Sequence, residues 1–97
     1  MIRHIVFFSA GNGHSVDEIR EGLMMLREIP YSQSFEVGCN LQSDAITGAS
    51  VDLVVYAEFE DEDSLAAYKA HPIYTQCIDL VRPMREMRIA ADFKSEL

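Results

Sequence analysis

The sequence has 97 residues, 48% hydrophobic and 25% charged, which suits a single folded domain over residues 1–97 and excludes a disordered chain. Sixteen acidic residues against eight Lys and Arg give a net charge of −8, which disfavours binding to nucleic acids and to anionic membrane surfaces. The apolar run over residues 2–8 is too short for a membrane span and lacks the features of a signal peptide, so we expect a cytoplasmic protein.

The first predicted elements are a strand over residues 2–9 and a helix that ends at Pro30. Ile, Val and Phe dominate the strand, and Gly11-Asn12-Gly13 follows it as a turn. A capping box begins the helix, because the Ser15 hydroxyl can accept from a free amide while Glu18 reaches back. Apolar residues then recur at helical spacing: Val16, Ile19, Leu23, Met25 and Leu26.

Two more strands are predicted over residues 34–42 and 51–59. In the first of them, apolar and polar side chains alternate, which gives it one apolar face. Residues 43–50 between them have the composition of a hairpin loop, in which Gly48 supplies an unusual backbone angle.

The second half of the chain contains a broken helix and a last strand. Asp61 can cap a helix that runs to His71-Pro72, because the residue before a proline avoids the helical region. Pro72 can open a second helical piece that ends at Pro83, and residues 85–93 form the strand. The order βαββαβ predicts an α+β, ferredoxin-like fold with helices on one face of a four-stranded antiparallel sheet.

Two of the predicted strands are apolar on both faces. Residues 2–8 place Ile2, Val6 and Phe8 opposite Ile5 and Phe7, and residues 53–59 place Leu53, Val55, Ala57 and Phe59 opposite Val54 and Tyr56. A sheet with one face in water should instead alternate apolar and polar side chains. We therefore expect a homodimer through the second sheet face, with two-fold pairing. A monomer with a few exposed aliphatic side chains stays open as the alternative.

The sequence contains no pattern typical of a metal or cofactor site. Cys39 and Cys77 form no Cys-x-x-Cys motif, so we expect reduced, buried thiols and no disulfide. Metal-ligand spacing, a Gly-x-Gly-x-x-Gly loop and a Gly-x-Ser-x-Gly elbow are all missing from the sequence. We predict neither a metal nor a cofactor.

His4, Tyr68 and His71 are the candidate catalytic residues. His4 shares a strand face with Val6 and Phe8, so its imidazole points into an apolar layer, and Tyr68 and His71 share a helix face. An imidazole and a phenol beside an apolar cavity could move protons to and from a carbonyl substrate. The alternative is structural: His4 hydrogen-bonds a buried carbonyl, while Tyr68 and His71 stabilise the helix break.

Arg88 and Asp92 share one side of the last strand, opposite Met87 and Phe93. We interpret Arg88 and Asp92 as a surface or interface pair rather than as part of a site.

Four segments, in order along nearly the whole chain, resemble the stress-responsive A/B barrel family. They are Met1 to Phe8, Glu36 to Asn40, Glu58 to Pro72 with its Tyr-x-x-His-Pro motif, and Arg88 to Phe93. The resemblance implies a ferredoxin-like subunit whose sheet packs on its twin to form a dimeric α/β barrel. Most members have no assigned reaction, and some plant members are stress-induced.

One member of that family is a polyketide cyclase that performs an aldol condensation without a metal or cofactor. Its catalytic tyrosine corresponds to Tyr68 and its strand histidine to His4, but Tyr74 occupies the position of its catalytic histidine. Because a phenol with a pKa of about 10 is a poor base at neutral pH, the resemblance does not extend to the cyclase reaction. We expect Val6, Phe8 and Tyr74 to line the pocket that remains.

Three functions stay open at this point. The first is a homodimeric protein of unassigned activity that binds a small apolar or aromatic ligand between sheet and helices. The second is a cofactor-independent enzyme, similar to polyketide cyclases or small monooxygenases, that uses His4, Tyr68 and His71. The third is a purely structural dimer. The tyrosine at position 74 favours the first over the second.

Overall fold

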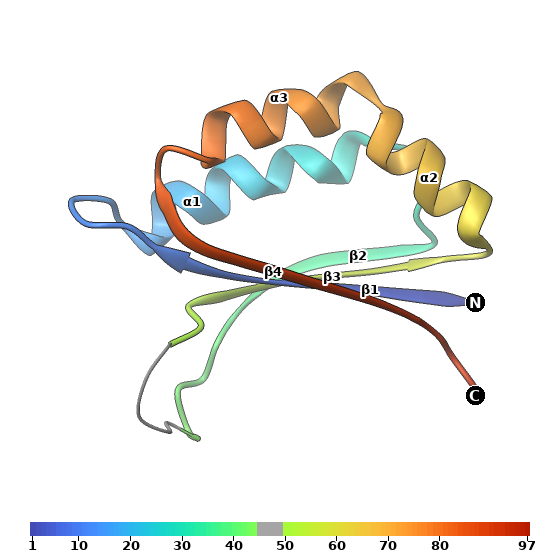
Figure 1. The fold of residues 1–97 in the computed structure, drawn as a ribbon, viewed down its shortest axis with the longest axis horizontal. Coiled ribbons are helices and arrows are strands. Elements are labelled where there is room, and N and C mark those ends of the chain that lie inside the picture. Colours follow the sequence, from blue (N-terminus) through green and yellow to red (C-terminus); the bar gives the residue numbers. More distant parts are fainter. Residues whose placement is uncertain (45–49) are drawn as a thin grey trace.

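The computed structural model describes residues 1–44 and 50–97, which form an antiparallel sheet of four strands with helices over one face (Figure 1). The elements are β1 (Ile2–Ala10), α1 (Val16–Leu23), the 3₁₀ helix η1 (Met24–Glu28), β2 (Ser34–Cys39), β3 (Leu53–Phe59), α2 (Glu62–Ala70), α3 (Pro72–Val81) and β4 (Arg85–Lys94). The predicted ferredoxin-like order is confirmed, and the role predicted for Gly48 lies outside the described residues. Within these two ranges, no helix is both long enough and apolar enough to cross a membrane.

The sheet order is β2-β3-β1-β4, and every neighbouring pair is antiparallel. β1 and β4 are paired so that His4 lies opposite Asp92 and Phe8 lies opposite Arg88. Opposite residues project from the same face of a sheet, so all four side chains lie on the helix side. This register decides which groups meet beneath the helices.

The helices begin where the sequence predicts. The Ser15 hydroxyl accepts from the Glu18 amide at 3.1 Å, and the Asp61 carboxylate accepts from the Ser64 amide at 2.8 Å. The first helix differs from its prediction in its last part, because residues 24–28 wind as a tighter 3₁₀ helix.

The second and third strands of the chain are shorter than the sequence predicts. β2 ends at Cys39 and β3 begins at Leu53, and one backbone hydrogen bond, from the Asn40 amide to the Asp52 carbonyl at 2.9 Å, continues just beyond them. The side-chain amide groups of Asn40 and Gln42 each donate to the Val51 carbonyl at 2.7 Å, and Gln42 has a φ of 59°. A turn of this kind diverts the chain from regular pairing.

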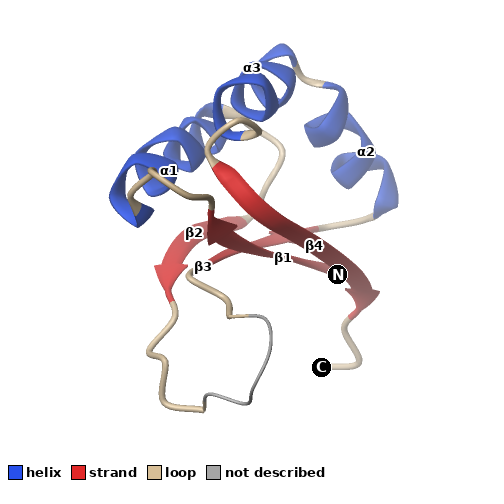
Figure 2. Ribbon diagram, turned by 60° about the vertical axis from the view of Figure 1, so that its left-hand side comes forward, coloured by secondary structure: helices blue, strands red, loops and turns tan. Residues whose placement is uncertain are grey.

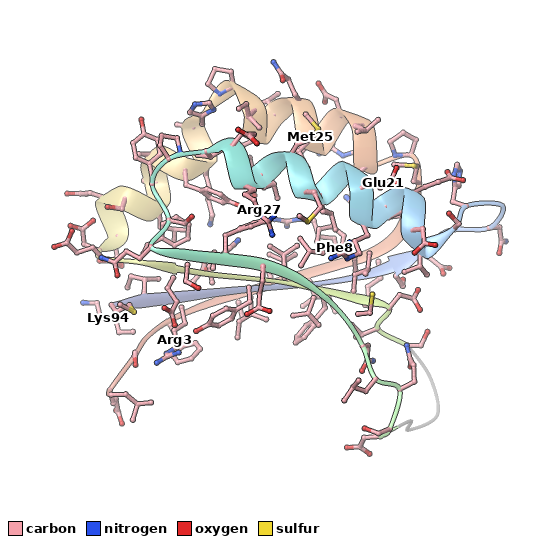
Figure 3. All side chains as sticks on the ribbon, turned by 180° about the vertical axis from the view of Figure 1, so that it is seen from behind. Arg3, Phe8, Glu21, Met25, Arg27 and Lys94 are labelled. Atoms are coloured by element: carbon pink, nitrogen blue, oxygen red, sulfur yellow. The ribbon has the colours of Figure 1, made fainter. Side chains whose placement is uncertain are left out.

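The core fills the space between the sheet and the helices. Phe8 points into this layer, as Figure 3 shows from behind the molecule. α1 and α3 approach closely at Gly22, where a Cβ atom would lie 3.0 Å from Val81 Cγ2. The Cys77 thiol is buried here, 3.5 Å from the Gly22 carbonyl oxygen, whereas Cys39 is exposed at the end of the edge strand β2. The prediction of a buried thiol is therefore wrong for Cys39.

The other sheet face, called the outer face below, has no helix over it (Figure 2). Its apolar residues are Ile5, Phe7, Val54, Tyr56, Met87, Ile89, Ala91 and Phe93. Ile89 is 55% exposed and Phe93 is 49% exposed. Arg3 also lies on this side (Figure 3), where it donates to Tyr56 at 2.6 Å and pairs with Glu58 at 3.1 Å. An apolar centre with a charged pair at one end is typical of a contact surface.

Candidate functional site

A cavity of about 240 Å³ lies between the helix side of the sheet and the helices. The sheet contributes His4, Val6, Phe8, Val55, Arg85 and Arg88, and the helices with their ends contribute Leu23, Leu26, Tyr68, Tyr74, Cys77, Ile78, Val81 and Arg82. Val6, Phe8 and Tyr74, the predicted pocket residues, all line this cavity. Most of the wall is apolar, and the polar groups are concentrated at His4, at the two tyrosines and at the arginines.

His4 is paired with Asp92 on the neighbouring strand. Its side chain is 1% exposed, and Nδ1 is hydrogen-bonded to Asp92 Oδ1. Lys69 from α2 lies on the far side of the carboxylate, with Nζ 3.3 Å from Oδ2. The β1–β4 register turns Asp92 and Arg88 toward the helix side, where both stay exposed as predicted for a surface pair, but Asp92 also bonds to His4 and Arg88 lines the cavity. The structural alternative for His4 named the wrong partner, since Nδ1 bonds to a carboxylate rather than to a carbonyl.

The charges of this pair follow from its surroundings. Burial lowers the pKa of His4, and the hydrogen bond to Asp92 opposes this only in part. Burial raises the pKa of Asp92, but the hydrogen bond from His4 and the charges of His4 and Lys69 outweigh it, so the pKa of Asp92 is lowered. At neutral pH Asp92 is therefore an anion that accepts the Nδ1 proton of a neutral His4. Nε2 then carries a free lone pair.

Tyr68 is completely buried, with 0% exposure. Its ring packs 4.9 Å from the ring of Phe59, 5.8 Å from that of His4 and 5.3 Å from that of Tyr74. Its hydroxyl has no hydrogen-bond partner among the described residues. Burial, followed by the charges of Tyr74 and Cys77, raises the pKa of Tyr68, so the phenol stays protonated. Tyr68, a residue of the cavity wall, thus carries a hydrogen-bond donor that the described residues leave unused.

Three arginines also line the cavity. Arg88 donates to the Tyr74 hydroxyl at 3.1 Å, and Arg82 and Arg85 line the wall beside it. Burial, followed by the charges of Arg88 and Arg82, lowers the pKa of Arg85, in keeping with their closeness. The sequence reasoning missed Arg82 and Arg85, although three arginines within residues 82–88 were a visible signal in so acidic a chain.

His71 lies apart from the other candidates. It does not line the cavity; its Nδ1 accepts from the Ile73 amide at 3.1 Å and so caps α3. Its ring lies edge-on to Tyr31 at 6.3 Å. The structure brings His4, Tyr68 and Tyr74 together and leaves His71 at the junction of α2 and α3. Over the described ranges, no group of three His, Cys, Asp or Glu side chains could hold a metal ion.

Comparison with known proteins places this geometry in context. A family model described as "Stress responsive A/B Barrel Domain" matches residues 2–95. No curated protein is matched. The solved structures that share the fold include the following three. One is a dimeric ferredoxin-like protein of unknown function from Thermobifida fusca, with 27% identity, TM-score 0.78 and coverage of 95% of this chain and 88% of that one.

The second is a Dabb family protein with a ferredoxin-like fold from Mesorhizobium loti, with 23% identity, TM-score 0.77 and coverage of 97% and 95% of the two chains. The third is an antibiotic biosynthesis monooxygenase, with 14% identity, TM-score 0.75 and 98% coverage of both chains. At these identities the second and third structures establish the shared fold alone.

Proposed function

This chain belongs to the stress-responsive A/B barrel (Dabb) family, and within that family we propose that it is a homodimer whose subunits each bind a small apolar or aromatic molecule. The site is the cavity between the sheet and the helices. The observation that carries the proposal is Tyr68, which lines an apolar cavity and whose buried hydroxyl has no partner among the described residues.

An unpaired buried hydroxyl is costly, about 1–3 kcal/mol, and native proteins seldom keep one without a use for it. A ligand with an oxygen acceptor would relieve this cost at Tyr68. The volume also suits a ligand, because an apolar cavity of about 150 Å³ is enough for a benzene ring, and this one is about 240 Å³. Aromatic and aliphatic walls favour an apolar body for that ligand.

The test is a titration with 4-phenyl-2-butanone, a neutral aromatic ketone, followed by backbone amide shifts in NMR. We expect saturable shifts at residues that line the cavity. Ile78→Trp should abolish them, because Ile78 lines the cavity and an indole would fill it. Ile73→Trp on the same helix is the matched control, since Ile73 does not line the cavity and should leave binding intact. Shifts scattered over the whole surface, or none, would contradict the proposal.

The homodimer is supported by the outer face and by the printed description of the Thermobifida fusca relative as dimeric. Ile89 and Phe93 are about half exposed at the centre and end of β4. Pairing two outer faces would remove this apolar surface from water, which stabilises by roughly 25 cal/mol per Å² buried. A closed two-fold arrangement is the commonest way to achieve this.

A second candidate function is acid–base catalysis without a cofactor, and the His4–Asp92 pair favours it. The Nε2 lone pair of His4 can take a proton from the α-carbon of a bound carbonyl compound, and Tyr68 can donate to the oxygen on which charge develops. His71, the third candidate catalytic residue predicted from the sequence, would contribute only by capping α3.

Exchange of the α-protons of 4-phenyl-2-butanone in D₂O, followed by NMR, tests the second candidate. An enzyme should speed the exchange over buffer, and His4→Gln and Tyr68→Phe should each remove the acceleration. Binding of the ketone without faster exchange would leave the protein as a binding protein and would exclude catalysis on this substrate class.

A further inference from the structure

The three arginines of the cavity stand out against the charge of the whole chain. Lys and Arg number eight against sixteen Asp and Glu, yet Arg82, Arg85 and Arg88 all line this one cavity. No Asp or Glu lines it. Positive charges gathered in this way attract a ligand that carries a negative charge.

Among the Lys and Arg residues of the described chain, only Arg3 and Lys69 form ion pairs. Arg3 is paired with Glu58 at 3.1 Å and Lys69 with Asp92 at 3.3 Å. No ion pair joins Arg82, Arg85 or Arg88 to a carboxylate in the part of the chain that the structure describes. The one hydrogen bond from this group runs from Arg88 to the neutral Tyr74 hydroxyl at 3.1 Å, which orients the guanidinium but leaves its charge unbalanced.

The polar groups of the cavity start from different places along the sheet. His4 lies opposite Asp92 and Phe8 lies opposite Arg88, so the backbone positions of His4 and Arg88 are about four residues apart along the strands, or roughly 13 Å. The ring of Tyr68 lies 5.8 Å from the ring of His4. A ligand that satisfies both the Tyr68 hydroxyl and the arginines must carry an oxygen acceptor for the first and a negative charge for the second.

We infer that the ligand is an organic acid, with its carboxylate held by Arg82, Arg85 and Arg88 and its apolar body directed toward Tyr68 and His4. Guanidinium groups match a carboxylate because their planar N–H pairs can donate to both oxygens at once. This inference rests on the proposed binding function and adds the chemical class of the ligand.

The test compares two probes of nearly the same shape, 3-phenylpropionate and its neutral amide 3-phenylpropionamide, by NMR titration at low and high salt. We expect the acid to bind at least ~10-fold more tightly than the amide at about 50 mM salt, with a smaller preference at about 300 mM. Arg85→Gln combined with Arg88→Gln should reduce the preference for the acid over the amide to about one, because the carboxylate then loses its charged partners.

Arg20→Gln is the matched control, because Arg20 lies on α1 and does not line the cavity. It should leave the acid preference intact. Should the double variant fail to fold, the salt dependence of the unaltered protein still decides the question. Equal affinity for acid and amide overturns the inference while the proposed function stands. Absence of binding by both probes and by the neutral ketone overturns the two together.

Discussion

At Tyr68 the fold buries a hydroxyl that has no hydrogen-bond partner among the described residues. The ring is well packed against Phe59, His4 and Tyr74, so the residue is part of the core as well as of the site. Mutation can separate the contribution of the packed ring from that of the hydroxyl, because phenylalanine keeps the ring and removes only the oxygen.

Tyr68→Phe should leave the free energy of unfolding unchanged or raise it by up to ~1 kcal/mol, since an unpaired buried hydroxyl is removed. The same change should weaken binding of the ketone probe. Urea denaturation and NMR titration measure the two effects. Tyr68→Ala is the contrast, with an expected loss of about 3–5 kcal/mol from the cavity it leaves. A large loss of stability in Tyr68→Phe would show that the hydroxyl has a partner after all.

His4 makes the stability of the protein depend on pH. Its pKa is lowered from 6.5 in the folded state, mainly by burial, so below pH 6.5 the unfolded chain takes up a proton that the folded chain refuses. The free energy of unfolding should therefore fall as pH drops, by up to ~1.4 kcal/mol per pH unit, until the folded imidazole also protonates.

His4→Gln should show a smaller slope between about pH 7 and pH 5, because glutamine does not titrate. Urea denaturation at several pH values gives the comparison. Asp92 titrates below this window, since its pKa is lowered from 3.8, so it does not mask the effect. Identical slopes for the two proteins would mean that His4 is as easily protonated in the fold as in the unfolded chain.

Among the elements, the junction of α2 and α3 depends on one side chain. His71 ends α2, and its Nδ1 accepts the Ile73 amide at the start of α3. Pro72 fixes the first position of α3. The cap sets where α3 begins, and α3 supplies Tyr74, Cys77 and Ile78 to the cavity wall.

His71→Ala should lower the free energy of unfolding by about 1 kcal/mol through loss of the cap, while His71→Asn should retain most of it. Thermal and urea denaturation measure both variants. Because His71 does not line the cavity, the affinity of His71→Asn for the ketone probe should match that of the unaltered protein. A loss of affinity in a stable His71→Asn variant would show that His71 takes part in binding.

The elements themselves could be predicted because their signals are local. Caps at Ser15 and Asp61, the break at Pro72 and the alternation in β2 all act within a few residues. The partner of His4 could not be predicted, because it depends on the register of β1 against β4, which shifts between Ser9 and Ala10. The meeting of Arg82, Arg85 and Arg88 likewise depends on how the chain turns between α3 and β4.

At the scale of the whole molecule, substitutions on the outer face test whether two subunits pair there. Ile89→Asp should convert the protein to a monomer, since a buried, unpaired carboxylate in a dimer contact is costly. Size-exclusion chromatography with light scattering measures the mass. Leu80→Asp is the matched control, because Leu80 is 49% exposed but lies on α3, on the opposite layer. A monomeric unaltered protein, or a dimer that survives Ile89→Asp, would contradict pairing through this face.

The helices cover one side of the sheet and the outer face is on the other (Figure 2), and the cavity lies on the helix side. The lining residues that this chain supplies lie on the helix side, so a substitution on the outer face leaves their side chains in place. Ile89→Asp should therefore separate assembly from recognition, and the ketone probe should bind this variant with unchanged affinity.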